Sequence, residues 1–503
     1  MSPRASITAA EWLERAALVR PRNELFIDGA FVPSASGRTF DDFTGRDGSI
    51  ITKVAEGGAE DVDRAVAAAR QSFDDGRWAG QSPANRKRVL LRLAELIREN
   101  RDELALLESL DVGKPIRDTL AVDVPSCAKT IQWYAETIDK VYGEVGPTGP
   151  DALSLVTREP IGVVAAIVPW NYPLIITAWK LGAALATGNS VVLKPASQSP
   201  LTALRLGELA VDAGLPDGVL NVIAGPGSVI GDALARHPGV DKIAFTGSTE
   251  VGKSLLRAVG DSDVKAISLE LGGKSPQLVL ADVGDLATAA ASIGSGIFYN
   301  GGQTCNAGSR LIVHRSVREE LVERIAALGR DMVPGEPLDP TTQMGSMVDE
   351  RHLDKVLGYV RLGEREGARV VTGGQRVREE TGGYFIPPTI LDGVDNGWRV
   401  AREEIFGPVL TVTEFVDEAD GLRLANDTPY GLAAGIWTRD LNRAHRLSRA
   451  IRAGVVWVNT FDAADITVPF GGYKQSGFGR DKGLAALDGY TQVKTTWFDL
   501  SGE

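Results

Sequence analysis

The stretch GVVAAIVPWNYPLIITAWKLGAALATGNSVVLK, residues 162–194, contains two short apolar runs separated by a longer segment with helical character. The first run, Gly162–Val168, is rich in β-branched residues, and the second is Ser190–Leu193. Leu174–Ala186, between them, is long enough to form a helix. Because no hairpin turn joins the two runs, they predict parallel strands connected by a helix that covers the sheet.

The same alternation continues toward the C-terminus. Further segments of this first series are Leu201–Ala213, Val219–Ile223, Ser228–Arg236, Lys242–Phe245, Glu250–Val259 and Ala266–Leu271. After a Gly-Gly-Lys stretch that is a plausible hinge, a second series begins with Gln277–Leu280, Leu286–Ile297, Arg310–His314 and Arg318–Leu328 and runs to about Gly479. The sequence therefore predicts two α/β domains, with a cleft between them where a cofactor and a substrate could meet.

The two ends of the chain carry their own signals. Leu25–Val32 predicts a hairpin around an Asp-Gly turn, and helices are expected over about Ala59–Phe73 and from Ser82 through Leu107. Thr8-Ala-Ala-Glu11 is typical of a capping box that opens a helix, and not of a secretory signal. Thr491–Phe498 alternates β-forming residues, so we expect it to pair either within the chain or with a partner subunit.

Composition excludes several classes of protein. The 503 residues are 43% hydrophobic and 24% charged, as in ordinary globular proteins. The 54 Lys+Arg against 66 Asp+Glu give a net charge of −12 without a basic cluster, which argues against binding to nucleic acid or anionic lipid. The most apolar stretch, Gly162–Trp179, is interrupted by Pro169, Asn171 and Pro173, so no membrane span is expected.

Cysteine and histidine are sparse. Cys127 and Cys305 are far apart, so a disulfide framework is not expected and a reducing cytoplasm fits best. The four histidines have no paired spacing, and we expect no metal site.

Three polar residues stand where chemistry could occur. Cys305 lies in a glycine-rich polar loop, which is typical of a reactive thiol, whereas Cys127 lies at a predicted helix start and is expected to be structural. Glu270 ends a predicted strand and could serve as the base that a thiol needs, although a surface carboxylate is the alternative. Asn171, between two prolines on a rigid turn, could donate a hydrogen bond to an oxyanion.

Signals for a dinucleotide are present but not specific. No Gly-x-Gly-x-x-Gly sequence follows the first strand. Phe245–Gly252 passes from a strand into a helix with glycine at both ends of the turn, which permits a phosphate to approach the helix N-terminus. Lys194 places one cation at a strand end. An ordinary strand-to-helix turn and a solvated lysine are the alternatives.

Taken together, seven motifs resemble the aldehyde dehydrogenase superfamily in order and spacing, through nearly the whole chain. They are Trp170-Asn171, Lys194-Pro195, Phe245–Thr249, Leu269–Ser275, Gly302–Cys305, Glu403–Pro408 and Pro469–Gly477. The resemblance implies the α/β aldehyde dehydrogenase fold. A Rossmann-like dinucleotide-binding domain would comprise residues 1–139 and 160–272, a catalytic domain residues 273–480, and a small β oligomerisation element of a homodimer or homotetramer residues 140–159 and 481–503.

The resemblance also implies roles for individual residues. Cys305 would be the nucleophile and Glu270 the general base, with Asn171 and the Cys305 backbone N–H as the oxyanion hole and Lys180 as a further catalytic residue. The residues that would bind NAD are Val168, Pro169, Trp170, Lys194, Ser197, Gly227, Phe245, Gly247, Ser248, Leu271, Glu404 and Phe406. Members of the family that prefer NAD usually carry Glu where this chain has Ser197, so NADP is expected to be tolerated as well.

Within the superfamily, the chain looks most similar to the branch that oxidises ω-aminoaldehydes in polyamine and arginine breakdown. The similarity lies in Glu11-Trp12, Asp465–Thr467 and Gly477–Lys482. It implies that Asp123 recognises the amine of the substrate. The alternative is that Asp123 only caps or solvates a helix turn. The residues that would contact the substrate are Asp123, Tyr172, Trp179, Thr304, Asn306 and Asp465.

The reaction implied is oxidation of an aldehyde such as γ-glutamyl-γ-aminobutyraldehyde or aminobutyraldehyde to its acid. The Cys305 thiolate would add to the carbonyl, hydride would pass to the nicotinamide, and water activated by Glu270 would hydrolyse the thioester. Alternatives are an enzyme for betaine aldehyde or for a broad range of aliphatic aldehydes, a cysteine esterase on the same fold, and a binding protein without catalysis.

Overall fold

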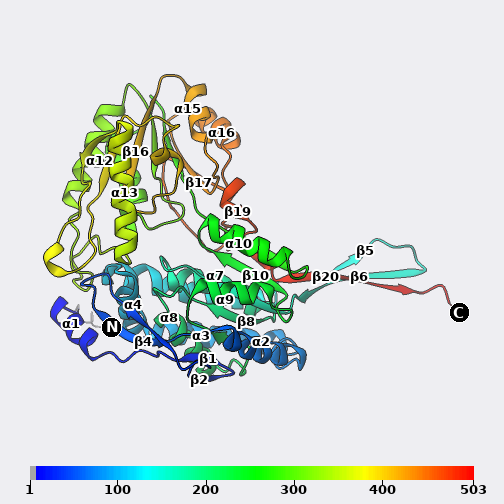
Figure 1. Ribbon diagram of the computed structural model, residues 1–503. Coiled ribbons are helices and arrows are strands. Elements are labelled where there is room, and N and C mark those ends of the chain that lie inside the picture. The colour runs from blue at the N-terminus through cyan, green and yellow to red at the C-terminus, as the bar shows by residue number, and fades with distance from the viewer. Residues whose placement is uncertain (1–6, 503) are drawn as a thin grey trace, which may run out of the picture.

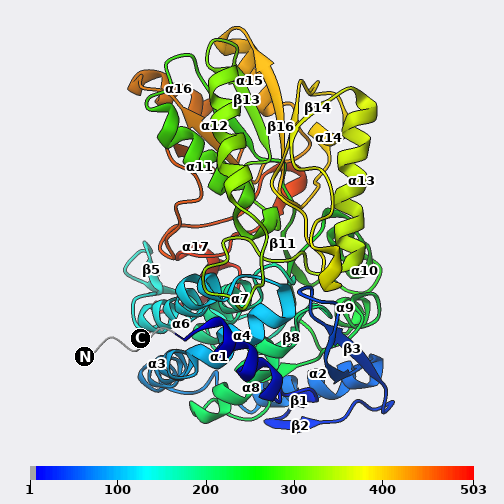
Figure 2. The same ribbon diagram turned by 90° about the vertical axis from the view of Figure 1, so that its left-hand side faces the viewer.

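The structure is a computed structural model that describes residues 7–502. Residues 1–6 and 503, which belong to the expected segments 1–139 and 481–503, lie outside the described residues. Two large sheets form separate lobes, and a long β-arm extends from the lobe that contains the N-terminal half of the chain (Figures 1 and 2). The two predicted series of strands and helices correspond to these lobes.

The first sheet has eight strands in the order β19-β11-β10-β7-β8-β9-β1-β2. Its strands are β1 (Leu25–Ile27), β2 (Ala30–Val32), β7 (Val163–Ile167), β8 (Ser190–Lys194), β9 (Leu220–Val222), β10 (Lys242–Thr246), β11 (Ala266–Glu270) and β19 (Gly477–Phe478). The five strands from β11 to β9 are parallel, and β7, β8 and β10 are buried along their whole length. Helices on both faces explain these continuous apolar runs.

The helices of this lobe divide between the two faces of the sheet. α7 and α8 pack together beside α3 and α6, while α2 packs against α9, which also contacts α10 (Figure 1). The helical segments are α1 (Ala9–Leu18), α2 (Ala59–Asp74), α3 (Pro83–Glu99), α4 (Arg101–Val112), α5 (Ile116–Asp118), the π-helix η1 (Thr119–Asp123), α6 (Val124–Thr137), α7 (Pro173–Ala186), α8 (Leu201–Asp212), α9 (Gly227–Arg236) and α10 (Thr249–Gly260).

The predicted helix starts near the N-terminus are present, but one predicted helix is divided in two. Thr8 and Glu11 form the capping box of α1, and the Ser82 hydroxyl accepts a hydrogen bond from the Asn85 N–H at the start of α3. The helix expected from Ser82 through Leu107 is interrupted at Asn100, which lies between α3 and α4 with non-helical backbone angles. A short two-stranded sheet, β3 (Thr39–Phe43) and β4 (Ile50–Ala55), precedes α2.

The second sheet has seven strands in the order β14-β15-β16-β13-β12-β17-β18, all parallel except β14. They are β12 (Pro276–Val279), β13 (Arg310–His314), β14 (Arg369–Thr372), β15 (Thr389–Asp392), β16 (Val409–Phe415), β17 (Ala433–Trp437) and β18 (Val455–Val458). The helical segments are α11 (Leu286–Phe298), η2 (Tyr299–Gly302), α12 (Arg318–Asp331), α13 (Glu350–Glu366), η3 (Glu379–Thr381), α14 (Arg399–Arg402), α15 (Glu418–Asn426), α16 (Leu441–Ala450), η4 (Lys474–Ser476) and α17 (Ala485–Asp488).

The C-terminal part of the chain crosses back to the first lobe. β19 lies within the segment expected to form the catalytic domain, 273–480, yet it pairs antiparallel with β11 at Leu269 and Glu270. α17 then packs against α7. This return places the loop before β19 beside the carboxyl end of β11, where Glu270 stands.

The arm is a three-stranded antiparallel sheet, β20-β6-β5. Its strands are β5 (Glu144–Gly146), β6 (Ala152–Pro160) and β20 (Thr491–Asp499), and the register runs from Thr491 opposite Pro160 to Asp499 opposite Ala152. The terminal strand therefore pairs within the chain, one of the two alternatives. Val145, Val493 and Trp497 are more than half exposed on the arm.

Candidate active site

Two cavities meet at the carboxyl ends of β10 and β11. The first, of about 280 Å³, lies between α6, α7 and the loop before α17, and the second, of about 200 Å³, lies over the turn between β10 and α10. Both are lined by Ile176, Thr246, Glu270, Leu271 and Cys305. The thiol and the carboxyl group expected to react therefore stand at the junction of the two cavities.

Cys305 is presented by a tightly turned loop. After α11 the chain passes through three residues with positive φ, Asn300, Gly301 and Gly302. A Cβ on Gly302 would lie 2.1 Å from the Gly407 carbonyl oxygen, so only glycine permits this close approach. The thiol contacts the Asn306 side-chain oxygen at 3.9 Å, and burial raises the pKa of Cys305. The sulfur therefore rests as a thiol and needs a proton acceptor to become a nucleophile.

Glu270 is the last residue of β11 and is buried. Within residues 7–502, neither of its carboxyl oxygens has a hydrogen-bond partner. Burial, and then the nearby charge of Asp481, raise the pKa of Glu270 well above its ordinary value. An unsolvated carboxylate is a strong base, so Glu270 is suited to accept a proton at the junction of the cavities.

Both the side-chain amide and the backbone carbonyl of Asn171 form hydrogen bonds. Its side-chain Nδ2 donates to the Gln303 carbonyl oxygen at 2.8 Å, and its own carbonyl oxygen accepts from Asn300 Nδ2 at 3.1 Å. An amide nitrogen carries two hydrogens, so one N–H of Asn171 remains for another acceptor. Asn171 lines the second cavity together with Cys305, which suits it to contact a negatively charged oxygen there.

Lys180, expected among the catalytic residues, is found outside both cavities. It is buried on α7, and its Nζ pairs with Asp481 Oδ2 at 3.1 Å. The charges of Lys180 and Asp481 act on Glu270 in opposite directions. Lys180 therefore contacts neither cavity, and its charge favours the ionised form of Glu270.

The second cavity contains most of the expected cofactor residues. Those that line it are Pro169, Trp170, Gly247, Ser248, Leu271, Glu404 and Phe406. Two residues that the sequence did not indicate, His352 and Lys355, also line it. The His352 ring nitrogen bonds the Phe406 carbonyl oxygen at 2.7 Å, and burial lowers the pKa of His352 to about 4, so this ring is neutral at neutral pH.

Lys194, Ser197 and Gly227 form a separate group beside this cavity, at the carboxyl end of β8 and the start of α9. A Cβ on Gly227 would lie 3.5 Å from Lys194 Nζ, and the Ser197 hydroxyl donates to the Gly225 carbonyl oxygen at 2.9 Å. Burial lowers the pKa of Lys194 to about 8, and no hydrogen bond or ion pair of its Nζ occurs within the described chain. This cation is available to a polar ligand.

The remaining two expected cofactor residues, Val168 and Phe245, are core residues and do not line the cavity. The Phe245 ring lies under Gly247, where a Cβ would come within 2.4 Å of it. Their contribution is to support the turns above them.

The arrangement of the second cavity and the Lys194 group fits a dinucleotide. β7 is flanked by β8 and β10, so the strand order reverses there. Open α/β sheets bind dinucleotides at the carboxyl ends of the strands at such a point.

The first cavity contains five of the six expected substrate residues, namely Tyr172, Trp179, Thr304, Asn306 and Asp465. Asp123 does not line it, and this prediction is wrong. Asp123 is fully buried at the end of η1, where its Oδ1 pairs with Lys114 Nζ at 2.6 Å. Lys114 Nζ also lies 3.9 Å from the centre of the Tyr172 ring. The acid therefore neutralises a lysine of its own chain.

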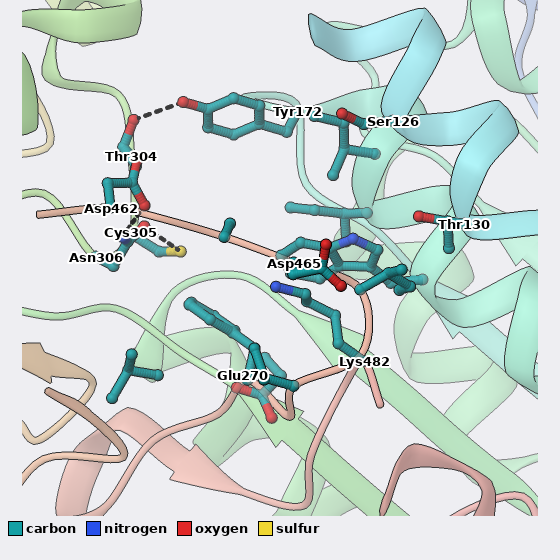
Figure 3. Close-up of a pocket in the computed structure, with 18 of the residues that line it drawn as sticks. Ser126, Thr130, Tyr172, Glu270, Thr304, Cys305, Asn306, Asp462, Asp465 and Lys482 are labelled. Carbon is teal, nitrogen blue, oxygen red and sulfur yellow. Dashed lines mark hydrogen bonds between the residues drawn. The ribbon is translucent and has the colours of Figure 1, made fainter. Parts of the chain in front are cut away.

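Several residues that line the first cavity were not indicated by the sequence. They include Ser126, Lys129, Thr130, Tyr299, Trp457, Asp462, Phe470 and Lys482. Asp462 accepts a hydrogen bond from Asn306 Nδ2 at 2.7 Å (Figure 3). Lys129 pairs with Asp465 at 3.0 Å, and both side chains are largely exposed. Phe470 and Lys482 lie within segments quoted for their resemblance, Pro469–Gly477 and Gly477–Lys482, and these were the available signals. The others come from elements distant in sequence.

Residues 7–502 contain neither a cluster of metal ligands nor a helix able to span a membrane. We find no group of three or more His, Cys, Asp or Glu side chains placed to hold a metal ion. We also find no helix with both the length and the apolar character that crossing a membrane requires.

Comparisons with known proteins agree with the fold. Residues 31–496 match the Aldehyde dehydrogenase family. The chain is 51% identical over 491 residues, 98% of each chain, to the NADP/NAD-dependent aldehyde dehydrogenase PuuC of Escherichia coli (strain K12). Among solved structures, indole-3-acetaldehyde dehydrogenase in complex with NAD+ matches with a TM-score of 0.98 at 51% identity, over 98% of this chain and 100% of that chain.

A second solved structure is the γ-glutamyl-γ-aminobutyraldehyde dehydrogenase from Burkholderia cenocepacia J2315. It is 54% identical, with a TM-score of 0.96 over 98% of this chain and 100% of that chain. The matches extend over both lobes and the arm, in agreement with the resemblance of the seven motifs. The chain belongs to the aldehyde dehydrogenase family.

Proposed function

We propose that this protein oxidises an aldehyde to its carboxylic acid, with NAD or NADP as the hydride acceptor. The observation that carries the proposal is the shared position of Cys305 and Glu270, which line both cavities. A substrate in the first cavity and a nicotinamide in the second would meet at the sulfur. The names of the two relatives, one NADP/NAD-dependent and one solved with NAD+, support the choice of cofactor.

In this proposal Glu270 accepts the proton of the Cys305 thiol, and the thiolate forms a C–S bond to the carbonyl carbon. One N–H of Asn171 and the Cys305 backbone N–H stabilise the oxyanion that results. NAD(P), when bound in the second cavity, would supply the acceptor for the hydride that this carbon loses, and a thioester on Cys305 would remain. Glu270 then releases that proton to solvent and accepts a second one from the water that attacks the thioester carbonyl. The C–S bond breaks, the second proton passes to the departing sulfur, and the acid leaves as the thiol is restored.

The cofactor would extend from the second cavity to the Lys194 group. Lys194 and Ser197 would contact the adenosine ribose, Ser248 and Trp170 the pyrophosphate, and Glu404 the nicotinamide ribose. Ser197 supplies a hydroxyl and no carboxylate at this point, so it does not repel a 2′-phosphate. We therefore propose that both NAD and NADP are used.

We propose an ω-aminoaldehyde as the substrate class. The name of the Burkholderia cenocepacia structure supports this class, and so do the aromatic wall and the acids Asp462 and Asp465 of the first cavity. Aromatic faces and carboxylates are the groups that bind amines. A betaine aldehyde or simple aliphatic aldehyde enzyme is the alternative, favoured if those aldehydes give the higher kcat/KM.

We further propose the domain division 1–139 with 160–272, 273–480, and the arm segments 140–159 with 481–503, in a homo-oligomer that works in the cytoplasm. The exposed apolar side chains of the arm, including Val493 and Trp497, support a self-associating surface. The free thiols of Cys127 and Cys305 support a reducing compartment.

The test is production of reduced nicotinamide, followed by its absorbance, with a panel of aminoaldehydes, betaine aldehyde and alkanals. We expect aldehyde-dependent reduction of both cofactors that is lost in Cys305→Ala. Ester hydrolysis without any reduction of cofactor would instead favour the cysteine esterase.

A further inference from the structure

The first cavity contains a lysine cation without a counter-ion. Lys482 lies in the loop between β19 and α17, and 5% of its surface is exposed. Its Nζ lies 5.6 Å from the centre of the Trp179 ring and 6.0 Å from that of Phe470. Within residues 7–502 the ammonium has no hydrogen bond and no ion pair. In Figure 3 it points into the cavity, on the side of Asp465.

Three of the other charged side chains of this cavity already have a partner, whereas Glu270, placed at the reacting end, has none within residues 7–502. Lys129 and Asp465 pair with each other at the rim, at 3.0 Å. Asp462 accepts a hydrogen bond from Asn306. Lys482 is therefore not part of an internal ion pair.

A buried cation is costly unless an anion or several hydrogen-bond acceptors accompany it. Two aromatic rings provide part of this compensation. The rest can come from a ligand that enters the cavity with a negative group. Conversely, a substrate whose far end is only cationic would be repelled by Lys482.

We propose that Lys482 binds a carboxylate at the end of the substrate remote from the aldehyde. The Asp465 and Asp462 carboxylates, whose charges act on Lys482, can accept an adjacent ammonium. The cavity is then matched to an aldehyde that ends in an amino acid zwitterion, as a γ-glutamyl-linked aminoaldehyde does. This inference rests on the proposed function and, within its ω-aminoaldehyde class, favours substrates that carry a remote carboxylate over those whose remote end is only cationic.

The experiment compares wild type, Lys482→Met and Lys482→Arg with γ-glutamyl-γ-aminobutyraldehyde, 4-aminobutyraldehyde and butanal. In Lys482→Met we expect kcat/KM for the γ-glutamyl substrate, relative to butanal, to fall by about 10- to 100-fold, the usual value of a charge-assisted hydrogen bond. The loss should lie in KM, because the contact is the same in ground and transition states. Lys482→Arg should keep most of the preference, and 4-aminobutyraldehyde should gain relative to butanal in Lys482→Met.

Lys242→Met is the matched control. Lys242 is also a buried lysine, 5.2 Å from the Tyr490 ring, and it does not line the cavity. This variant should leave the ratio between the two substrates at the wild-type value, whatever its effect on stability.

A second measurement uses the wild type alone, in case Lys482→Met does not fold. N-butyl-γ-glutamylamide, which lacks the aldehyde, should inhibit about 10-fold more tightly than the analogue whose α-carboxylate is an amide. An unchanged substrate ratio in a folded Lys482→Met, or equal inhibition by the two analogues, would overturn the proposal. Failure of the wild type to reduce NAD(P) with any of the three aldehydes would instead overturn the proposed function.

Discussion

Replacement of Lys114 by methionine should destabilise the protein in a way that depends on pH. Lys114 and Asp123 are both completely buried and lie 2.6 Å apart, and the buried Glu108 carboxyl group interacts with both, so the substitution removes the cation that serves these two acids. At that separation and an effective dielectric constant of about 20, the lost attraction is about 6 kcal/mol. The loss of stability has an upper limit, however, because the folded variant can take up a proton on Asp123 instead of keeping a buried charge.

This upper limit can be calculated. Placing a proton at pH 7 on a carboxyl with an ordinary pKa of about 3.9 costs about 4 kcal/mol, and each lower pH unit reduces that cost by about 1.4 kcal/mol. The folded variant therefore holds a proton that its unfolded chain releases, and its stability falls as pH rises above about 4. We expect Lys114→Met to lose about 4 kcal/mol at pH 7 and about 1.5 kcal/mol at pH 5 relative to wild type.

The measurement is urea unfolding of wild type and variant at both pH values. Lys129→Met is the matched control, because its pair with Asp465 is exposed and should contribute less than about 1 kcal/mol to stability at either pH. Lys114→Met/Asp123→Asn should recover most of the loss. A loss that is the same at both pH values, or a double variant no more stable than Lys114→Met, would refute the idea that an unpaired Asp123 carboxylate is the cause.

Three further predictions concern the reaction. Asn171→Ala should lower kcat by about 100- to 1000-fold with little change in NAD binding, measured by steady-state kinetics and cofactor titration; an unchanged kcat would exclude it from the oxyanion hole. Ser197→Glu should reduce kcat/KM for NADP by about 10-fold or more and that for NAD by less than about 3-fold, and equal effects would remove Ser197 from the cofactor site. Because the pKa of Glu270 is raised and its carboxylate is the base, kcat/KM of the wild type should rise with pH through that raised pKa. Glu270→Gln should remove this rise and slow acid release by about 100-fold or more. A wild-type pH profile in the variant would contradict this role for Glu270.

The fold was predictable from the sequence where burial leaves a local pattern. Parallel strands buried on both faces, such as β7 and β8, appear as continuous apolar runs, and both lobes followed from this signal. β19 was not foreseen, because a two-residue strand has no periodicity and its pairing with β11 depends on the chain returning from the second lobe. The interruption at Asn100 was likewise hidden, since the apolar spacing continues across it.

The candidate site was predictable only in part, for the same physical reason. Cys305, Glu270 and Asn171 stand on turns or strand ends, and their local sequences were enough to single them out as candidates. The partner of a charged residue cannot be read from the local sequence. The prediction of Asp123 as an amine-binding acid therefore missed its pairing with Lys114. Asp462 and Lys482 reach the cavity through tertiary folding of distant loops.

The central claim is that the Cys305 sulfur bonds covalently to the aldehyde carbon before the acid forms. The direct measurement is the rate of acid formation by Cys305→Ser and Cys305→Ala, each checked for a wild-type fold and for NAD binding. We predict a rate at least about 1000-fold below that of wild type in both variants. Acid formation at the wild-type rate in either variant would contradict the account.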